Sequence, residues 1–145
     1  MKVLFVCTGN TCRSPMAEGL FNSYSKQSDL FSSSAGISVI EGSKVSINSV
    51  EALKEYNIDI SYHIPKQLTI DLLNEFDLII TMSQSHKDFI SSFYPQGLNK
   101  MHAFSEYTAG NDIFDPYGCD LKIYQMCASQ INKGIINLIE SLKDA

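Results

Sequence analysis

Residues 3–6 form a continuous apolar run, Val-Leu-Phe-Val, which is followed by a glycine-containing loop and then by Ser14-Pro15. An apolar run without alternating polar residues is typical of a strand that is buried on both faces, as in a parallel sheet. Serine is a favoured helix N-cap and proline a favoured first helical residue, so we expect a helix from Ser14 to about Lys26. The start of the chain thus predicts a buried strand, a loop and a helix.

The same alternation continues along the chain. We expect further strands at 30–34, 77–82 and 100–104, helices at 46–56, 70–76 and 84–94, and a last helix capped by Asp120. A long loop, 105–119, precedes this last helix. Strands that alternate with helices predict an α/β fold with a parallel sheet covered on both faces. In such folds the active site lies beyond the carboxyl ends of the strands, and Cys7 ends the first strand.

Length and charge exclude several classes of protein. The chain has 145 residues, which suits one domain over 1–145, and 44% of them are apolar, enough for a core. The net charge of −5 argues against nucleic-acid and anionic-membrane partners. No apolar run approaches the roughly 18 residues that span a bilayer, and the first run is too short for a signal peptide. We therefore expect a cytoplasmic protein.

The four cysteines are Cys7, Cys12, Cys119 and Cys127. A chain of this size with an ordinary core does not need disulfides, and neither the cysteines nor the scattered histidines have the spacing of metal ligands. We expect no metal site, and nothing in the sequence places a histidine beside Cys7. In a reducing compartment the thiols are catalytic, redox-sensing or simply buried, and we expect Cys119 and Cys127 to be structural.

The segment Cys7-Thr8-Gly9-Asn10-Thr11-Cys12-Arg13-Ser14 has the pattern C-x5-R-[ST] between a strand and a helix. A loop of this length can turn its backbone N–H groups inward as an anion nest, to which the following helix adds its positive end. Arg13 carries a planar fork that matches two phosphate oxygens, and in this positive field we expect Cys7 to be a thiolate. A thiolate beside a bound phosphate is set for nucleophilic phosphoryl transfer.

Three further residues of this loop have expected roles. Ser14 can hydrogen-bond the sulfur and help it leave in a second step, Asn10 can brace the loop, and Gly9 permits a close approach or a positive φ. The competing interpretation is a buried thiol, a surface arginine and an ordinary turn, but the flanking strand and helix start weigh against it. A nucleotide-binding P-loop is excluded because no Gly-Lys-[Ser/Thr] follows Gly9.

Phosphoryl transfer from a poor leaving group also needs a general acid. Asp115-Pro116-Tyr117 lies in the long loop after the fourth strand, where Pro116 would stiffen the loop and Tyr117 could wall a cleft. An Asp-Pro pair is also common in turns, and Asp112 and Asp120 lie nearby. Asp115 is the acid that we favour.

Residues 6–18, VCTGNTCRSPMAE, resemble the opening of the low-molecular-weight protein-tyrosine phosphatases. The resemblance continues through residues 34–36, the strand ending at residue 82 and residues 115–117, so it spans essentially the whole chain. It implies a four-stranded parallel sheet with the phosphate-binding loop after the first strand. It also implies Cys7 as nucleophile, Arg13 as phosphate binder and Asp115 as acid and then base, through a phosphocysteine and without a cofactor. Around the substrate it places Thr8, Gly9, Asn10, Thr11, Cys12, Ser14 and Tyr117.

Three departures from the tyrosine-specific members concern the substrate. Thr11 stands where those members usually have a bulky aliphatic residue, residues 37–42 lack the usual aromatic, and no second tyrosine follows Tyr117. In the first and third respects the chain is similar to a bacterial branch that includes protein-arginine phosphatases, in which threonine makes room for a guanidinium. The resemblance thus implies hydrolysis of phosphoarginine in proteins. The alternative is a phosphotyrosine phosphatase in which Thr11 is a neutral substitution.

Other functions on this scaffold fit less well. An arsenate reductase would need further cysteines after the third strand, where residues 83–90 contain none, and an inactive phospho-residue binding module would be expected to lose Cys7 or Asp115. The resemblance also suggests a reversible Cys7–Cys12 disulfide that protects the nucleophile, although Cys12 is equally well explained as a small apolar filler. The expected partners are phosphorylated proteins, and we expect a monomer.

Overall fold

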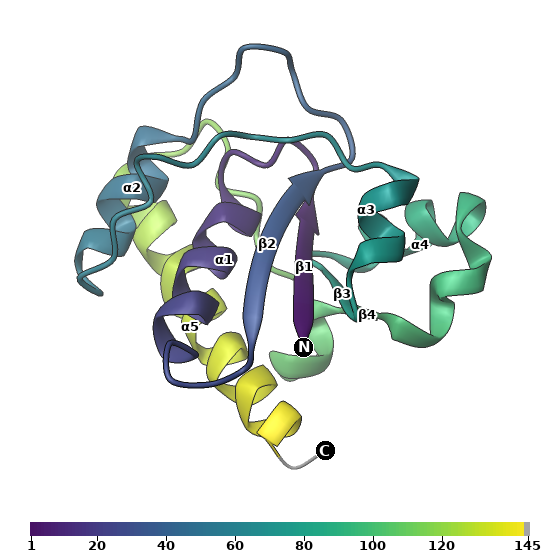
Figure 1. The fold of residues 1–145 in the computed structure, drawn as a ribbon. Coiled ribbons are helices and arrows are strands. Elements are labelled where there is room, and N and C mark those ends of the chain that lie inside the picture. The colour runs from purple at the N-terminus through teal and green to yellow at the C-terminus, as the bar shows by residue number, and fades with distance from the viewer. Residues whose placement is uncertain (144–145) are drawn as a thin grey trace.

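Four parallel strands form one sheet in the computed structural model, which describes residues 1–143 (Figure 1). The strands are β1 (Lys2–Cys7), β2 (Phe31–Gly36), β3 (Leu78–Thr81) and β4 (Met101–Ala103). The helices are α1 (Arg13–Tyr24), α2 (Ile47–Lys54), α3 (Ile70–Glu75), α4 (Gln84–Phe93) and α5 (Leu121–Lys143), with the 3₁₀ helices η1 (Pro95–Lys100) and η2 (Phe104–Tyr107). None of the helices in this described part is long and apolar enough to cross a membrane. The predicted four-stranded parallel α/β fold is confirmed.

Strand β1 lies inside the sheet, whose order is β2-β1-β3-β4. The register pairs Cys7 with Gly36 of β2 and Val6 with Thr81 of β3. The carboxyl ends of these three strands therefore meet at one edge, and the segments that follow them converge there. This is the edge at which the sequence placed the chemistry.

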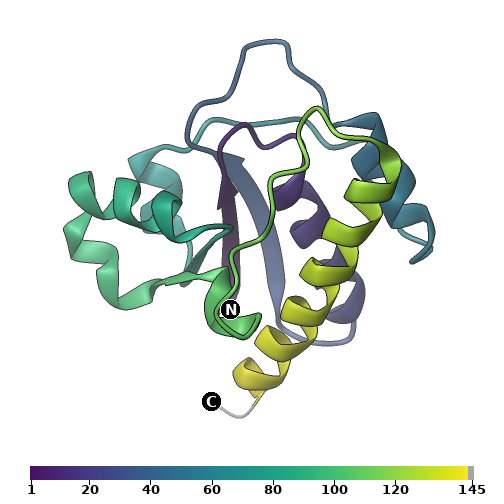
Figure 2. The ribbon, with the colours of Figure 1, turned by 180° about the vertical axis from the view of Figure 1, so that it is seen from behind.

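The apolar run of β1 is buried because its side chains alternate between two hydrophobic cores. Val3 and Phe5 pack with residues of α1 and α5 on one face of the sheet, and Leu4 and Val6 pack with residues of α3 and α4 on the other. Figure 1 and, from behind, Figure 2 show these two helix layers on either side of the strands. The loop after β1 is thus attached to the most completely buried strand.

The start of α1 differs from the prediction for a physical reason. The helix begins at Arg13 with Cys12 as its N-cap, so Ser14 lies in the first turn and is not the cap. Its hydroxyl is used by the preceding loop instead, 2.8 Å from Cys7 Sγ and 2.8 Å from Asn10 Nδ2. Pro15 is tolerated because N–H groups of the first helical turn have no intrahelical acceptor.

Some elements could not be predicted from periodicity. The short 3₁₀ helices were missed, and η2 takes up the first residues of the segment predicted as a loop. The spacing of apolar residues also does not give the buried face of α2, because Ile47 is 78% exposed and Ser49 is completely buried. Asp120 does cap α5 as predicted, because its Oδ1 accepts a hydrogen bond from the Ile123 N–H at 3.2 Å.

Candidate active site

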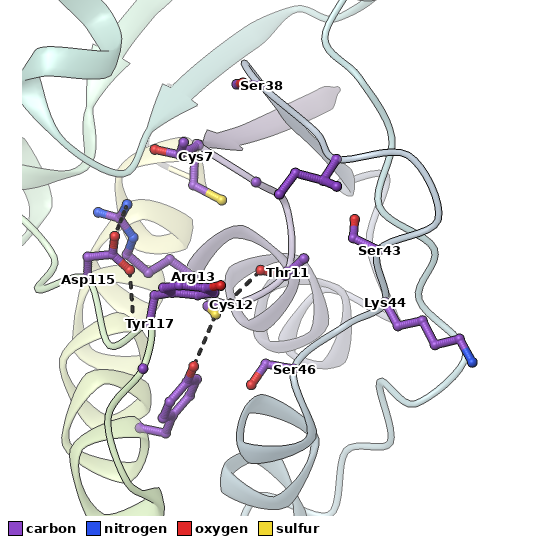
Figure 3. A pocket seen from close by; sticks show the side chains of 15 residues that line it. Cys7, Thr11, Cys12, Arg13, Ser38, Ser43, Lys44, Ser46, Asp115 and Tyr117 are labelled. Carbon is purple, nitrogen blue, oxygen red and sulfur yellow. Dashed lines mark hydrogen bonds and ion pairs between the residues drawn. The ribbon is translucent and has the colours of Figure 1, made fainter.

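A cavity of about 730 Å³ opens at the carboxyl end of β1. Its walls come from three separate parts of the chain, namely the loop after β1, the segment between β2 and α2, and the segment before α5 together with Tyr124. Cys7, Arg13, Asp115 and Tyr117 all line it (Figure 3). The fold therefore brings together residues that the sequence singled out more than a hundred positions apart.

The backbone of the loop after β1 is held by its carbonyl groups. The Thr8 carbonyl accepts from the Ser38 N–H at 2.9 Å, and the Thr11 carbonyl accepts from the Ser46 N–H at 2.9 Å. By contrast, among the turns, loops and caps of residues 1–143, none of the N–H groups of residues 8–13 donates to a backbone carbonyl. A loop whose carbonyls bind the scaffold and whose N–H groups remain free has the arrangement of an anion nest. The N-terminus of α1 strengthens its attraction for anions.

Asn10 braces this loop, as predicted from its amide. Its side chain is completely buried, and Nδ2 donates to Ser14 Oγ at 2.8 Å and to Ser34 Oγ at 3.0 Å. Its Oδ1 accepts from the Lys66 N–H at 3.0 Å. Asn10 also takes the left-handed backbone conformation, with φ of 58°. The positive φ considered for Gly9 is therefore wrong, because the turn places it one residue later.

The Cys7 sulfur faces the cavity (Figure 3), and Ser14 lies beside it. Cys7 Sγ lies 2.8 Å from Ser14 Oγ, and this pair is buried. Because Ser14 Oγ already accepts from the Asn10 amide, its own proton is free to be donated to the sulfur. A hydrogen bond of this kind stabilises the negative charge of a thiolate.

Arg13 and Asp115 form the charged part of the site. Arg13 Nη1 donates to the Ile113 carbonyl at 3.1 Å, and Nη2 lies 3.6 Å from Asp115 Oδ2. The Arg13 side chain is 7% exposed and that of Asp115 55% exposed, so the arginine is fixed and the carboxylate remains in contact with solvent. Asp115 Oδ1 also accepts from the Tyr117 N–H at 3.2 Å.

The two other acids considered from the sequence have different surroundings. Asp112 Oδ1 accepts from the Gln84 N–H at the start of α4 at 3.1 Å, and Asp120 caps α5. Of the three, only Asp115 lines the cavity. Its position next to Arg13 makes it the carboxyl group best placed to exchange a proton with a group bound beside Cys7.

The walls of the cavity differ in chemistry on their two sides (Figure 3). Asp115 and Tyr117 stand on one side, Ser43 and Lys44 stand on the other, and Ser38 and Ser46 line the two ends between them. Tyr117 is 77% exposed at the mouth, where it can cover a bound side chain. Thr11 lies between these walls, with its Oγ1 3.5 Å from Cys12 Sγ.

All four cysteines are free thiols in this structure. Cys12 Sγ lies 3.3 Å from the Tyr124 hydroxyl, and burial raises the pKa of Tyr124 to about 12. Burial likewise raises the pKa of Cys127 to about 12, so this thiol stays protonated, and it donates to the Phe114 carbonyl at 3.4 Å. Within residues 1–143, no three side chains among His, Cys, Asp and Glu come together as a metal site.

Sequence reasoning missed two histidines that contact the loop. His63 Nε2 lies 3.1 Å from both the Asn10 carbonyl and Asn10 Oδ1, and His86 Nε2 lies 2.9 Å from Thr8 Oγ1. Burial lowers the pKa of both rings, that of His86 to about 4. The only sequence signal for His86 was its position near the carboxyl end of a strand. Ser83, whose hydroxyl contacts the His86 ring, follows the end of β3.

Comparison with known proteins identifies relatives over the full length of the chain. Residues 2–145 match the family described as "Low molecular weight phosphotyrosine protein phosphatase". A protein-arginine-phosphatase of Bacillus subtilis is 36% identical over 147 residues, covering 99% of this chain and 97% of that protein. A low molecular weight protein-tyrosine-phosphatase, PtpB of Staphylococcus epidermidis, is 33% identical over 144 residues, covering 99% of this chain and 97% of that protein.

The solved structures that resemble this chain include the same two kinds of phosphatase. The low molecular weight protein tyrosine phosphatase from T. tengcongensis has a TM-score of 0.93 at 46% identity, covering 97% of this chain and 99% of that chain. A mutant of the YwlE arginine phosphatase, in which the active-site serine is phosphorylated, has a TM-score of 0.92 at 35% identity, covering 99% of this chain and 96% of that chain. Both likenesses extend over the sheet and the cavity described above.

Proposed function

The chain belongs to the low molecular weight phosphotyrosine protein phosphatase family, and we propose that it hydrolyses phosphoarginine in proteins through a phosphocysteine intermediate. The observation that carries the proposal is that Cys7, Arg13 and Asp115 line one cavity, with Thr11 beside them. The phosphorylated serine in the YwlE mutant shows a phosphoryl group on the active-site residue of that relative. The proposed partners are phosphorylated proteins.

In the first step the Cys7 thiolate attacks phosphorus. The N–H groups of residues 8–13 and the Arg13 fork hold the phosphoryl oxygens as charge develops on them. The bond from phosphorus to the leaving nitrogen breaks, its electron pair stays on nitrogen, and Asp115 donates the proton that neutralises it. The products are phosphocysteine and the released arginine side chain.

In the second step water replaces the sulfur. Asp115, now a carboxylate, takes a proton from a water molecule that attacks phosphorus. The phosphorus–sulfur bond breaks and its electron pair returns to Cys7 as a thiolate, which the Ser14 hydroxyl stabilises at 2.8 Å. Inorganic phosphate leaves, and the site returns to its first state.

The proposed preference for phosphoarginine rests on the oxygen atoms that line parts of the cavity. The guanidino group carries several N–H donors, from which carboxyl and hydroxyl oxygens can accept hydrogen bonds. Asp115, Thr11 and Ser38 supply such oxygens around the phosphate cradle. A phenyl ring would gain nothing from them, because it needs apolar walls.

Phosphotyrosine is the second candidate, supported by a different observation. Tyr117 and Ile40 also line the cavity, are largely exposed, and could cover an aromatic ring. The T. tengcongensis relative, at 46% identity, is described as a protein tyrosine phosphatase. The two substrates therefore have to be compared directly.

The test is kcat/KM on matched peptides that carry phosphoarginine, phosphotyrosine or phosphoserine, for wild type and Thr11→Ile. We expect wild type to prefer phosphoarginine, and Thr11→Ile to shift the ratio toward phosphotyrosine by roughly 10- to 200-fold. Cys7→Ser and Arg13→Lys should be inactive on every substrate, because a hydroxyl is a weak nucleophile and ammonium cannot form the bidentate fork. A wild-type preference for phosphotyrosine would assign the second candidate.

We also propose that Cys12 protects Cys7 under oxidants. Peroxide would convert the Cys7 thiolate to a sulfenic acid, and the Cys12 thiol would attack its sulfur and release water, forming a disulfide. Mild peroxide should then inactivate the enzyme, a thiol reductant should restore it, and mass spectrometry should find the Cys7–Cys12 crosslink. Irreversible loss of activity without this crosslink would reject the protective role.

Cellular context completes the proposal. We propose a monomeric cytoplasmic enzyme without nucleic-acid or membrane partners, on the basis of the net charge of −5 and the lack of long apolar runs in the sequence. Sedimentation of the purified chain would test the monomer, and localisation of a tagged chain in cells would test the compartment.

A further inference from the structure

His86 joins the phosphate-binding loop to the end of a different strand. Its Nε2 lies 2.9 Å from Thr8 Oγ1, and its Nδ1 lies 2.8 Å from the hydroxyl of Ser83, the N-cap of α4. The ring is 5% exposed, although Thr8 and His86 are 78 residues apart in the chain. Both ring nitrogens therefore have polar partners, and one of these partners belongs to the residue that follows the nucleophile.

We propose that His86 is a positioning residue for phosphoryl transfer, which holds the Thr8 hydroxyl and thereby directs the first N–H group of the loop at the phosphoryl oxygens. The proposal rests on the proposed function, because it takes the loop to be a phosphate cradle. It adds to that function a residue outside the loop that determines how well the cradle is formed before the substrate binds.

His86 holds the side chain of Thr8, whose backbone is held by the segment after β2. Thr8 is exposed at the cavity, between the buried strand β1 and the braced Asn10. Its carbonyl is held by the Ser38 N–H at 2.9 Å and its hydroxyl by His86. The N–H of Thr8 shares a peptide plane with the Cys7 carbonyl, which accepts from the Ile37 N–H at 3.0 Å. With the side chain and the next carbonyl also held, this N–H has one orientation, and a fixed donor costs no reorganisation when charge develops.

A neutral imidazole suits this position. The charged groups near the ring are Arg13 on α1 and Asp112 and Asp115 on the loop before α5. Burial and the nearby Arg13 lower the pKa of His86 to about 4, so the ring is uncharged at neutral pH. It can therefore hold Thr8 without competing with Arg13 for phosphate or drawing Asp115 away, as a lysine would.

Two substitutions separate the bond to Thr8 from the bond to Ser83. The amide nitrogen of Gln reaches about as far as Nε2 of His, so His86→Gln can retain the donor for Thr8. The amide of Asn reaches only as far as Nδ1, so His86→Asn retains the Ser83 side and loses Thr8. The matched control is His102→Asn, because His102 is a histidine on β4 that contacts Glu106 instead of the loop.

The experiment measures the inhibition constant of inorganic phosphate and kcat/KM on an aryl phosphate. We expect His86→Asn to weaken phosphate binding and lower kcat/KM by roughly tenfold, and His86→Gln to remain within about twofold of wild type. Thr8→Val should reproduce the loss. In the Thr8→Val background His86→Asn should cause no further loss, because the two residues act through one bond. Thermal melting verifies that each variant is folded.

Three results would overturn the proposal. They are full activity of His86→Asn, equal losses for the Asn and Gln variants, and a loss from His86→Asn that persists in the Thr8→Val background. The last two would indicate a purely structural role. Failure of the phosphatase activity itself looks different, since wild type would then neither bind phosphate nor form a phosphoenzyme. A preference for phosphotyrosine would leave the predicted loss on an aryl phosphate unchanged. As a spectroscopic test, the Nε2 resonance of His86 should shift when phosphate binds, and this shift should be lost in Thr8→Val.

Discussion

Residues that perform different steps of the proposed reaction differ in their exposure to water. Cys7 is 3% exposed and the Arg13 side chain 7%, whereas the Asp115 side chain is 55% exposed. A buried arginine attracts the phosphoryl oxygens more strongly, because less water screens its charge, and a sulfur shielded from water is free to attack phosphorus. An acid that gives a proton to the leaving group and later takes one from water has to contact both the bound substrate and solvent water. The half-exposed position of Asp115 at the cavity is suited to that exchange.

A substitution of Asp115 tests this assignment. Asp115→Asn keeps the shape and the turn but cannot donate a proton in the first step, so the loss should grow with the basicity of the leaving group. We expect a fall in kcat of roughly 10²- to 10⁴-fold on phosphoarginine and a smaller fall on an activated aryl phosphate. Steady-state kinetics on a series of aryl phosphates measures this dependence. Equal losses across the series would instead assign Asp115 to the structure of the loop.

The buried ring of His86 predicts a pH dependence of stability. Its pKa is lowered from 6.5 to about 4, so between these values the unfolded chain binds a proton that the folded chain does not. Stability from this group is complete above pH 6.5 and is lost as pH falls toward 4, by up to about 3 kcal/mol. Urea unfolding between pH 7 and 4 should show a shallower decline in His86→Gln than in wild type. Parallel curves would contradict the lowered pKa.

At the scale of the element, the phosphate-binding loop is shaped from outside. Its local chemistry was predictable, because C-x5-R-[ST] between a strand and a helix is a pattern within one short stretch. Its supports were not, because His63 contacts Asn10 across 53 residues and His86 contacts Thr8 across 78. Such contacts depend on strand order, which periodicity does not reveal. The predicted bond of Ser14 to the sulfur is present, whereas its expected N-cap role was wrong, because its hydroxyl is used by Cys7 and Asn10 of the loop.

Asn10 supports this loop through the hydrogen bonds of its side chain and through its left-handed backbone conformation, and two substitutions separate these effects. Asn10→Ala removes the bonds to Ser14, Ser34 and Lys66 and places alanine at a φ of 58°, whereas Asn10→Gly removes the bonds alone. We expect Asn10→Ala to lower the free energy of unfolding by about 3 kcal/mol and the glycine variant by about 1 kcal/mol less. Both variants should lose affinity for phosphate. Urea titration measures the first quantity and phosphate inhibition the second, and an Asn10→Gly variant that behaves like wild type would show that the side-chain bonds are dispensable.

At the scale of the whole molecule, aromatic packing joins the site's strand to the last helix. The ring of Phe5 on β1 contacts that of Phe21 on α1, with centroids 5.7 Å apart, and that of Phe104, at 6.4 Å. All three rings are completely buried. Phe104 in turn lies against α5 at Gly134, where a side chain would have no room. The strand that carries Cys7 is thus fixed by contacts from both ends of the sequence.

Gly134 is the position that tests this packing. A Cβ added there would lie 2.5 Å from Cε2 and from Cζ of Phe104 and 2.9 Å from Cγ2 of Thr108, so the Phe104 ring would have to leave its present position beside Phe5. In an open helix, replacing glycine by alanine stabilises by up to about 1 kcal/mol, because alanine has the higher helix propensity. In this core the overlap should outweigh that gain, and we expect Gly134→Ala to lower the free energy of unfolding by about 1–3 kcal/mol. The two effects have opposite signs, so urea unfolding distinguishes them directly. A more stable variant would mean that α5 can move outward without cost, and that Phe104 does not depend on this helix for its place against β1.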